Sequence, residues 1–244
     1  NGTDQRPVVA EASSFLLACK KEGSAGVWVR GIKQGLSVAA YPGKRTAWVV
    51  KALRETFDEF EAVSHVLETS LTNANHVVHP PGILLNLGLV ELSEKDWSFF
   101  FQGLSPAVCR AMEAIDSERL DILVQLDLPP TTALEWMLRF YGHQGLKGET
   151  LYEALSTTPI HGASKGPRTI DHRYITEDIP FGLVPMASIG RQLGVQVSAL
   201  EATVDLACMI SGRDWRKEGW TVEQLGLSGM SAAQMLEYVR EGGP

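Results

Sequence analysis

The period of the hydrophobic pattern changes near Glu68, and this change restricts the fold more than any other feature of the sequence. Before it, short apolar runs alternate with turn residues, which is typical of strands. We expect strands at 27–29 and 37–41 joined by a turn at 33–35, then a helix over 44–57 and a strand within 62–67. Strand, helix and strand in this order predict α/β structure, but only part of a sheet.

After Glu68 the pattern is that of successive helices. Four of them carry N-terminal capping signals, at Ser105 with Pro106, Thr132–Glu135, Ser198–Glu201 and Ser231. The first of these helices should stop at Leu128, and a long irregular segment rich in charged residues covers 156–182. The sequence therefore predicts a mainly α protein, in which an all-helical domain over 67–244 follows the end of an α/β domain over 1–66.

Composition narrows the possible partners. The 244 residues carry a formal net charge of -7 without a run of Lys or Arg, which argues against nucleic-acid and membrane binding. No apolar stretch approaches the ~20 residues that cross a bilayer. Cys19, Cys109 and Cys208 lie far apart in the sequence, and we expect reduced, buried thiols in a cytoplasmic protein.

The segment "NANHVVHPPGILLNLG" over 73–88 holds two histidines three residues apart. A metal site would need further ligands, and no HExxH or Cys/His cluster supplies them, so we predict no metal. For His76 a satisfied, partly buried imidazole is the expected role. His79 precedes Pro80, which disfavours helical backbone at His79, so we expect it to end one segment and face a gap. An imidazole placed there is suited to proton transfer near neutral pH.

The segment "DHRYITEDIPFGLVP" places Asp171, Arg173, Glu177 and Asp178 just before an apolar helix. One interpretation is structural, with acidic residues complementing the helix dipole and Arg173 paired to them. The other is functional, with a carboxylate that orients an imidazole and a guanidinium that binds a substrate carboxylate. Residue types alone leave both open.

A family resemblance favours the functional interpretation. "AEASSFLLACK", "LETSLTNANHVVHPPGILLNLG" and "HRYITEDIPFGLVPMASIGRQLGV" occur in the same order as in the octopine/nopaline (opine) dehydrogenases, which this chain resembles over nearly its whole length. The resemblance implies that residues 1–66 are the last part of a Rossmann-type NAD(P)-binding domain and that 67–244 are the all-helical substrate domain. It also implies that the glycine-rich dinucleotide loop lies outside this chain. The chain has no initiator Met, and we expect it to begin inside a domain.

The resemblance also assigns roles to residues. His79 matches the catalytic histidine, Asp178 its carboxylate partner and Arg173 the arginine that holds a substrate carboxylate. Glu11 is the cofactor-binding candidate. Directly after that glutamate the family tends to have Thr or Ser, whereas this chain has Ala12 followed by two serines. The substrate-binding candidates in that segment are Ser13 and Ser14.

The implied reaction joins the amine of an amino acid to a 2-keto acid, and NAD or NADP carries the hydride that reduces the imine. A homodimer is a possible assembly. Two other interpretations stay open. One is a related hydroxy-acid dehydrogenase with a catalytic lysine, although residues 68–94 contain no Lys. The other is a non-catalytic helical module. Trp136 and Tyr141 could contact an amino-acid side chain, but aromatic residues at helical spacing are typical of a core.

Overall fold

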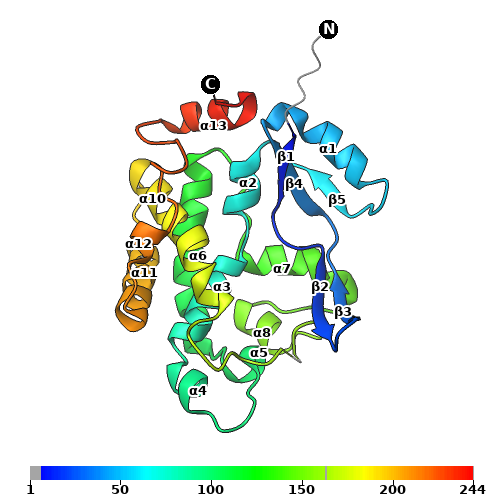
Figure 1. The fold of residues 1–244 in the computed structure, drawn as a ribbon, viewed down its shortest axis with the longest axis vertical. Helices are drawn as coiled ribbons and strands as arrows, with labels where there is room; N and C mark the ends of the chain where they lie inside the picture. The colour runs from blue at the N-terminus through cyan, green and yellow to red at the C-terminus, as the bar shows by residue number, and fades with distance from the viewer. Residues whose placement is uncertain (1–6, 163, 244) are drawn as a thin grey trace.

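A computed structural model describes residues 7–162 and 164–243 (Figure 1), in which the strands come first and most helices follow. The strands are β1 Val9–Ala12, β2 Leu17–Glu22, β3 Gly26–Ile32, β4 Leu36–Tyr41 and β5 Phe60–Ala62. The longer helices are α1 Thr46–Leu53, α3 Asn75–Leu84, α6 Pro106–Gln125, α7 Ala133–Tyr141, α10 Val184–Gln192, α11 Ser198–Ser211 and α13 Ala232–Glu241. The shorter ones are η1 Gly43–Arg45, α2 Val66–Leu71, α4 Leu87–Leu92, α5 Phe99–Gln102, η2 Gly142–Gln144, α8 Leu151–Ser156, α9 Arg173–Thr176, the π-helical turn η3 Ile179–Leu183 and α12 Trp215–Glu218.

Strand β4 lies at the centre of a three-stranded sheet with the order β1-β4-β5. β1 runs antiparallel to β4, with Val9 opposite Tyr41, and β5 runs parallel to β4, with Leu36 opposite Phe60. Helix α1 connects the two parallel strands, as in a βαβ unit. All β4 residues before Tyr41 are buried, as expected for a strand covered on both faces.

Strands β2 and β3 form a separate antiparallel hairpin that extends beside α7 (Figure 1). Strands are present at both predicted positions, 27–29 and 37–41, but they belong to different sheets, so the turn at 33–35 does not pair them. Gly35 in this turn has a φ of 64°, which favours glycine.

Cys109 is buried and Cys208 partly buried, whereas Cys19 is exposed on the hairpin, so the expectation of burial was wrong there.

The last strand lies earlier than the sequence indicated. Of the expected segment 62–67 only its first residue is in a strand, because β5 ends at Ala62 and α2 begins at Val66. The carboxylate of Glu68 accepts hydrogen bonds from the backbone N–H and the hydroxyl of Ser64, at 3.1 and 2.9 Å. These bonds bring the chain into the first turn of α2 instead of extending it.

Two helices end before their expected last residues. Helix α1 stops at Leu53, and Phe57, expected on its apolar face, is 43% exposed. Helix α6 begins as predicted, with the hydroxyl of Ser105 accepting a bond from the N–H of Val108, but it ends at Gln125. In both cases the apolar pattern of the sequence continues past the last helical residue, but the helix does not.

Helix α3 contains Pro80 and Pro81. His79 therefore does not end a segment, as the sequence suggested, but lies inside the helix. The two prolines lack N–H groups and cannot donate the helical hydrogen bonds expected at their positions. Both are buried, together with Ile83, and α3 packs against α6 and η3. Burial in the helical core overrides the local preference of residues next to proline.

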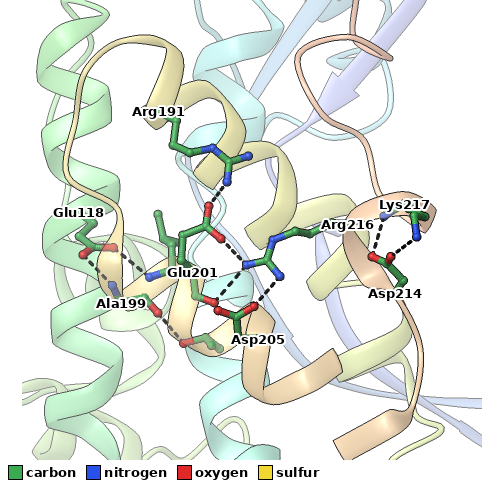
Figure 2. A network of polar contacts seen from close by, with 10 residues as sticks. Glu118, Arg191, Ala199, Glu201, Asp205, Asp214, Arg216 and Lys217 are labelled. Carbon is green, nitrogen blue, oxygen red and sulfur yellow. Dashed lines mark hydrogen bonds and ion pairs between the residues drawn. The ribbon is translucent and has the colours of Figure 1, made fainter. Parts of the chain in front are cut away.

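The start of α11 also differs from the prediction. Ser198 does not cap it through its hydroxyl; instead the carboxylate of Glu118 on α6 accepts bonds from the N–H groups of Ala199 and Leu200, at 2.7 and 2.9 Å (Figure 2). Glu201, the expected box partner, pairs with Arg191 and with an arginine of α12. The predicted capping box at Thr132–Glu135 is present, and so is the predicted cap at Ser231, which forms a box with Gln234.

The chain returns to its strands at the end. Helix α13 contacts η1 and α2 (Figure 1), and Lys44 pairs with Glu241 at 3.3 Å. The N–H of Gly243 donates to the hydroxyl of Tyr41 at 2.7 Å.

Within residues 94–162 and 164–243 the only strand-type pairing is the isolated bridge between Ser98 and Lys165. None of the helices in the described ranges is long and apolar enough to span a membrane.

Arg119 of α6 is fully buried and connects three segments. Its guanidinium donates to the carboxylate of Asp116 at 2.8 Å, to the carbonyl of Leu71 at 3.0 Å and to the carbonyl of Thr131 at 2.7 Å. The second oxygen of Asp116 accepts from the N–H of Ala133 at 2.7 Å. The pair therefore joins α6 to the end of α2 and to the beginning of α7.

Arg119→Ala should lower the free energy of unfolding by about 3–5 kcal/mol, because it leaves the Asp116 carboxylate buried without its charge partner. Denaturant unfolding measures this loss. The matched control is Arg110→Ala at an exposed position of α6, which should change stability by less than about 0.5 kcal/mol. The double variant Asp116→Leu, Arg119→Met should lose less than Arg119→Ala. Equal losses in the two would show that the unpaired charge is not the cause.

Candidate active site

Asp178 lies between two imidazoles. Its Oδ2 is 2.7 Å from Nδ1 of His79 and its Oδ1 is 2.8 Å from Nδ1 of His76. The predicted contact between His79 and Asp178, 99 positions apart, is therefore confirmed. His76 is partly buried and hydrogen-bonded, as expected, but it shares the same carboxylate, which the sequence did not indicate.

The local fold explains this arrangement. His76 and His79 are three residues apart on α3, so both rings lie on one side of the helix. Asp178 immediately precedes η3, which packs against α3. A Cβ added to Gly182 in that turn would lie 2.4 Å from Cγ of His76, so only glycine permits this close approach.

The hydrogen bonds define how the site is protonated. The Asn73 side-chain amide lies 3.1 Å from Nε2 of His76 and donates to it, so Nδ1 of His76 carries the proton given to Asp178. Burial opposes ionisation of Asp178, but the charge of His79 and the hydrogen bonds from both imidazoles outweigh burial and hold the pKa of the carboxyl well below its usual range. Asp178 is therefore a fixed anion at neutral pH.

Aromatic rings hold His79. The ring of Tyr174 stacks on its imidazole with a centroid distance of 3.7 Å and an interplanar angle of 11°, and Phe99 meets the imidazole edge-on at 6.2 Å. Burial raises the pKa of Tyr174, so its hydroxyl stays neutral. With Nδ1 bonded to Asp178, Nε2 of His79 is the nitrogen left for a ligand; it has no hydrogen-bond partner among the described residues.

The side chains of His76, His79, Tyr174 and Asp178 line a cavity of about 1330 Å³, which is larger than the roughly 300–1,000 Å³ of a typical small-molecule site. The four other predicted site residues differ in whether they line the cavity. Arg173, Ser14 and Glu11 line the cavity, while Ser13 is buried and is not part of the lining. Ser14 accepts from the Asn75 amide at 3.2 Å. In residues 7–162 and 164–243 no group of three His, Cys, Asp or Glu is placed to hold a metal ion.

Several lining residues were not identified from the sequence as parts of a site. Lys33, Arg30 and His161 line the cavity together with Trp136 and Tyr141. Burial, then the charges of Arg30, Lys33 and His79, lower the pKa of His161 to about 3, so this ring is neutral. Trp136 and Tyr141 are buried, as core residues would be, yet both border the cavity.

Comparison with known proteins gives consistent matches. Residues 62–211 match the family described as NAD/NADP octopine/nopaline dehydrogenase, alpha-helical domain. An opine dehydrogenase of Arthrobacter sp. (strain 1C) is 36% identical over 231 residues, covering 95% of this chain and 63% of that protein. A vitopine synthase of Allorhizobium ampelinum is 26% identical, covering 94% of this chain and 62% of that protein. The chain thus spans less than two thirds of the length of these relatives.

Solved structures share the fold. A structure of octopine dehydrogenase with NADH and L-arginine superposes with a TM-score of 0.72 at 19% identity, covering 97% of this chain and 65% of that one. A structure of yersinopine dehydrogenase without ligand gives a TM-score of 0.59 at 15% identity, covering 96% and 65%. At these identities the likeness concerns the fold.

Asp178→Asn should lower the free energy of unfolding at pH 7 by about 1–3 kcal/mol, because two buried imidazoles lose an ionic acceptor. The pKa of Asp178 is lower in the folded state than in the unfolded state. The ionised carboxylate therefore makes its full contribution to folding stability above the unfolded-state pKa of about 4. This contribution is lost as the pH falls towards the folded-state pKa. The stability difference between wild type and variant should therefore narrow below about pH 4. Denaturant unfolding at several pH values measures it, with exposed Asp121→Asn as the control. A difference independent of pH would contradict this role for the charge.

Proposed function

This chain belongs to the NAD/NADP octopine/nopaline dehydrogenase family, and from that premise we propose that it is the substrate-binding part of an NAD(P)H-dependent opine dehydrogenase. The reaction is reductive condensation of the amine of an amino acid with a 2-keto acid, or the reverse oxidation. The observation that supports it most directly is the His79–Asp178 pair opening on a large cavity that Arg173 also lines.

Each side chain has a definite task in this proposal. Nε2 of His79 exchanges a proton with the oxygen or nitrogen at the reacting carbon, as loss of water from the amine adduct requires. Asp178 fixes the tautomer of the imidazole and stabilises its cation. Arg173 holds a substrate carboxylate, for which its fork of N–H donors is suited. We find no carboxylate paired with Arg173 among the described residues.

NADH or NADPH would supply the hydride, and the strands fit such a group. A parallel β4–α1–β5 unit is the repeating element of dinucleotide-binding sheets, and β1 of the same sheet brings Glu11 to the cavity. Oε2 of Glu11 accepts hydrogen bonds from the hydroxyls of Thr69 and Ser70, the latter at 2.7 Å. Its Oε1 has no hydrogen-bond partner in the described part of the chain and would be available to the cofactor.

The same proposal divides the chain. Residues 1–66 are the end of a Rossmann-type cofactor domain and residues 67–244 are the helical substrate domain. The position of the strands supports this, because β1 to β5 all lie before residue 63 and the helical family match begins at residue 62. The cavity is lined from both sides of this boundary.

The test is NAD(P)H oxidation by the full-length protein, which should occur only when an amino acid and a 2-keto acid are both present. His79→Ala should lower kcat by about 10²- to 10⁴-fold, the usual value of general acid-base assistance. Arg173→Ala should act mainly through KM, because the proton donor remains. Exposed His143→Ala is the control.

Two results would reject the proposed reaction. Reduction of the keto acid at full rate without an amine would instead support a hydroxy-acid dehydrogenase. Unchanged turnover in His79→Ala, with turnover also unchanged in His143→Ala, would remove His79 from the chemistry.

A further inference from the structure

A set of hydrogen-bond donors in the cavity has no role in the proton transfer described above. Lys33 follows β3 directly and is only 5% exposed, and its Nζ donates to the carbonyl of Phe15 at 2.5 Å. The ammonium also lies 5.4 Å from the centre of the Tyr141 ring. Among the described residues no carboxylate pairs with it. A buried ammonium without an anionic partner is unusual and calls for one.

Two other donors of the cavity lining are also incompletely satisfied. Arg30 of β3 donates from Nη1 to the hydroxyl of Ser164 at 2.7 Å, but its Nε is buried without a partner in the described part of the chain. Nε1 of Trp136 on α7 is likewise buried and unpartnered there. Both residues line the cavity together with Lys33. Buried donors are normally hydrogen-bonded. The charges of Arg30 and Lys33 both lower the pKa of His161, so these two cations lie on the same part of the cavity wall.

The acidic groups of the cavity do not meet this need. Asp178 is held by the two imidazoles, and Glu11 accepts from two hydroxyls. Glu177 is the third acidic residue of the lining, and among the described residues no ion pair joins it to Lys33 or Arg30. Burial lowers the pKa of Lys33 to about 8, and the charge that partly offsets this effect is that of Cys19, not of a carboxylate. His161 beside these cations is neutral. This wall of the cavity therefore carries surplus positive charge.

We propose that Lys33 and Arg30 form a second carboxylate-binding subsite, distinct from Arg173, that holds a carboxylate of the amino-acid substrate. The assignment rests on the proposed function, in which the two substrates bring at least two carboxylates and Arg173 holds one. Two positively charged groups suit an anionic acceptor and no cation. The carboxylate belongs to the α-carbon of the amino acid or to an acidic side chain.

Three ligands distinguish these sources, with affinities measured by calorimetry on the full-length protein in the presence of NADH. L-glutamate carries both carboxylates, L-glutamine only the α-carboxylate and 4-aminobutanoate only the distal one. Lys33→Met should weaken L-glutamate binding by about 10- to 100-fold, the usual effect of a charge-assisted hydrogen bond. If the affinity for L-glutamine falls by a similar factor, the subsite binds the α-carboxylate. If instead the affinity for 4-aminobutanoate falls by a similar factor, the subsite binds the side-chain carboxylate.

The control is Lys51→Met, which removes the same charge from an exposed position of α1 outside the cavity lining and should leave all three affinities unchanged. Lys33→Arg should restore part of the lost affinity. Arg30→Gln repeats the test if Lys33→Met shows a thermal unfolding transition unlike that of wild type. Equal affinities in wild type and in both substituted proteins, or no binding of any of the three ligands to wild type, would overturn the subsite.

NADH oxidation in the same samples separates this proposal from the proposed function. Suppose that the protein turns over an amino acid with a keto acid, but that Lys33→Met binds the three ligands as tightly as wild type. This result rejects the subsite and leaves the dehydrogenase reaction standing. Binding that depends on Lys33, without turnover for any substrate pair, supports the subsite and rejects the dehydrogenase reaction.

Discussion

The buried guanidinium of Arg119 holds the end of α2 and the start of α7 against α6. A fully buried charge is tolerated only with complete pairing, and here the partners belong to three segments: Asp116 on its own helix, the end of α2 and the start of α7. Helix α2 leads directly into α3, which carries the two histidines, and α7 carries Trp136. One hydrogen-bonded cluster therefore sets two walls of the cavity relative to each other.

Secondary structure was predictable where its cause is local. The hydroxyls of Ser105, Thr132 and Ser231 cap helices within their own first turns, and those signals are readable from neighbouring residues. Helix α11 lacks such a cap because Glu118, about eighty residues earlier, binds its first N–H groups. The prolines of α3 likewise suggest a break until the burial of that helix is known. Contacts between distant segments account for these errors.

The same distinction applies to the site. His79, Asp178 and Arg173 were identifiable because each lies in a motif of a known family, and the contact between the first two is present. Tyr174 stands next to Arg173 in the sequence, but its stacking on His79 depends on how α9 packs against α3. Lys33 looked like an ordinary turn residue. Lys33 is buried because the β2–β3 hairpin lies against α7. The residues next to Lys33 in the sequence do not predict this packing.

The stacking of Tyr174 on His79 also affects the entropy of binding. An imidazole between an aromatic face and a carboxylate cannot turn about its side-chain bonds without losing both contacts. Immobilising one such side chain at the moment of association costs about 0.5–1.5 kcal/mol. Here the ring loses that rotational freedom when the protein folds, so a ligand that meets Nε2 finds it already oriented. In the proposed reaction such preorganisation would favour fast proton transfer, because the donor would not have to rearrange as charge develops.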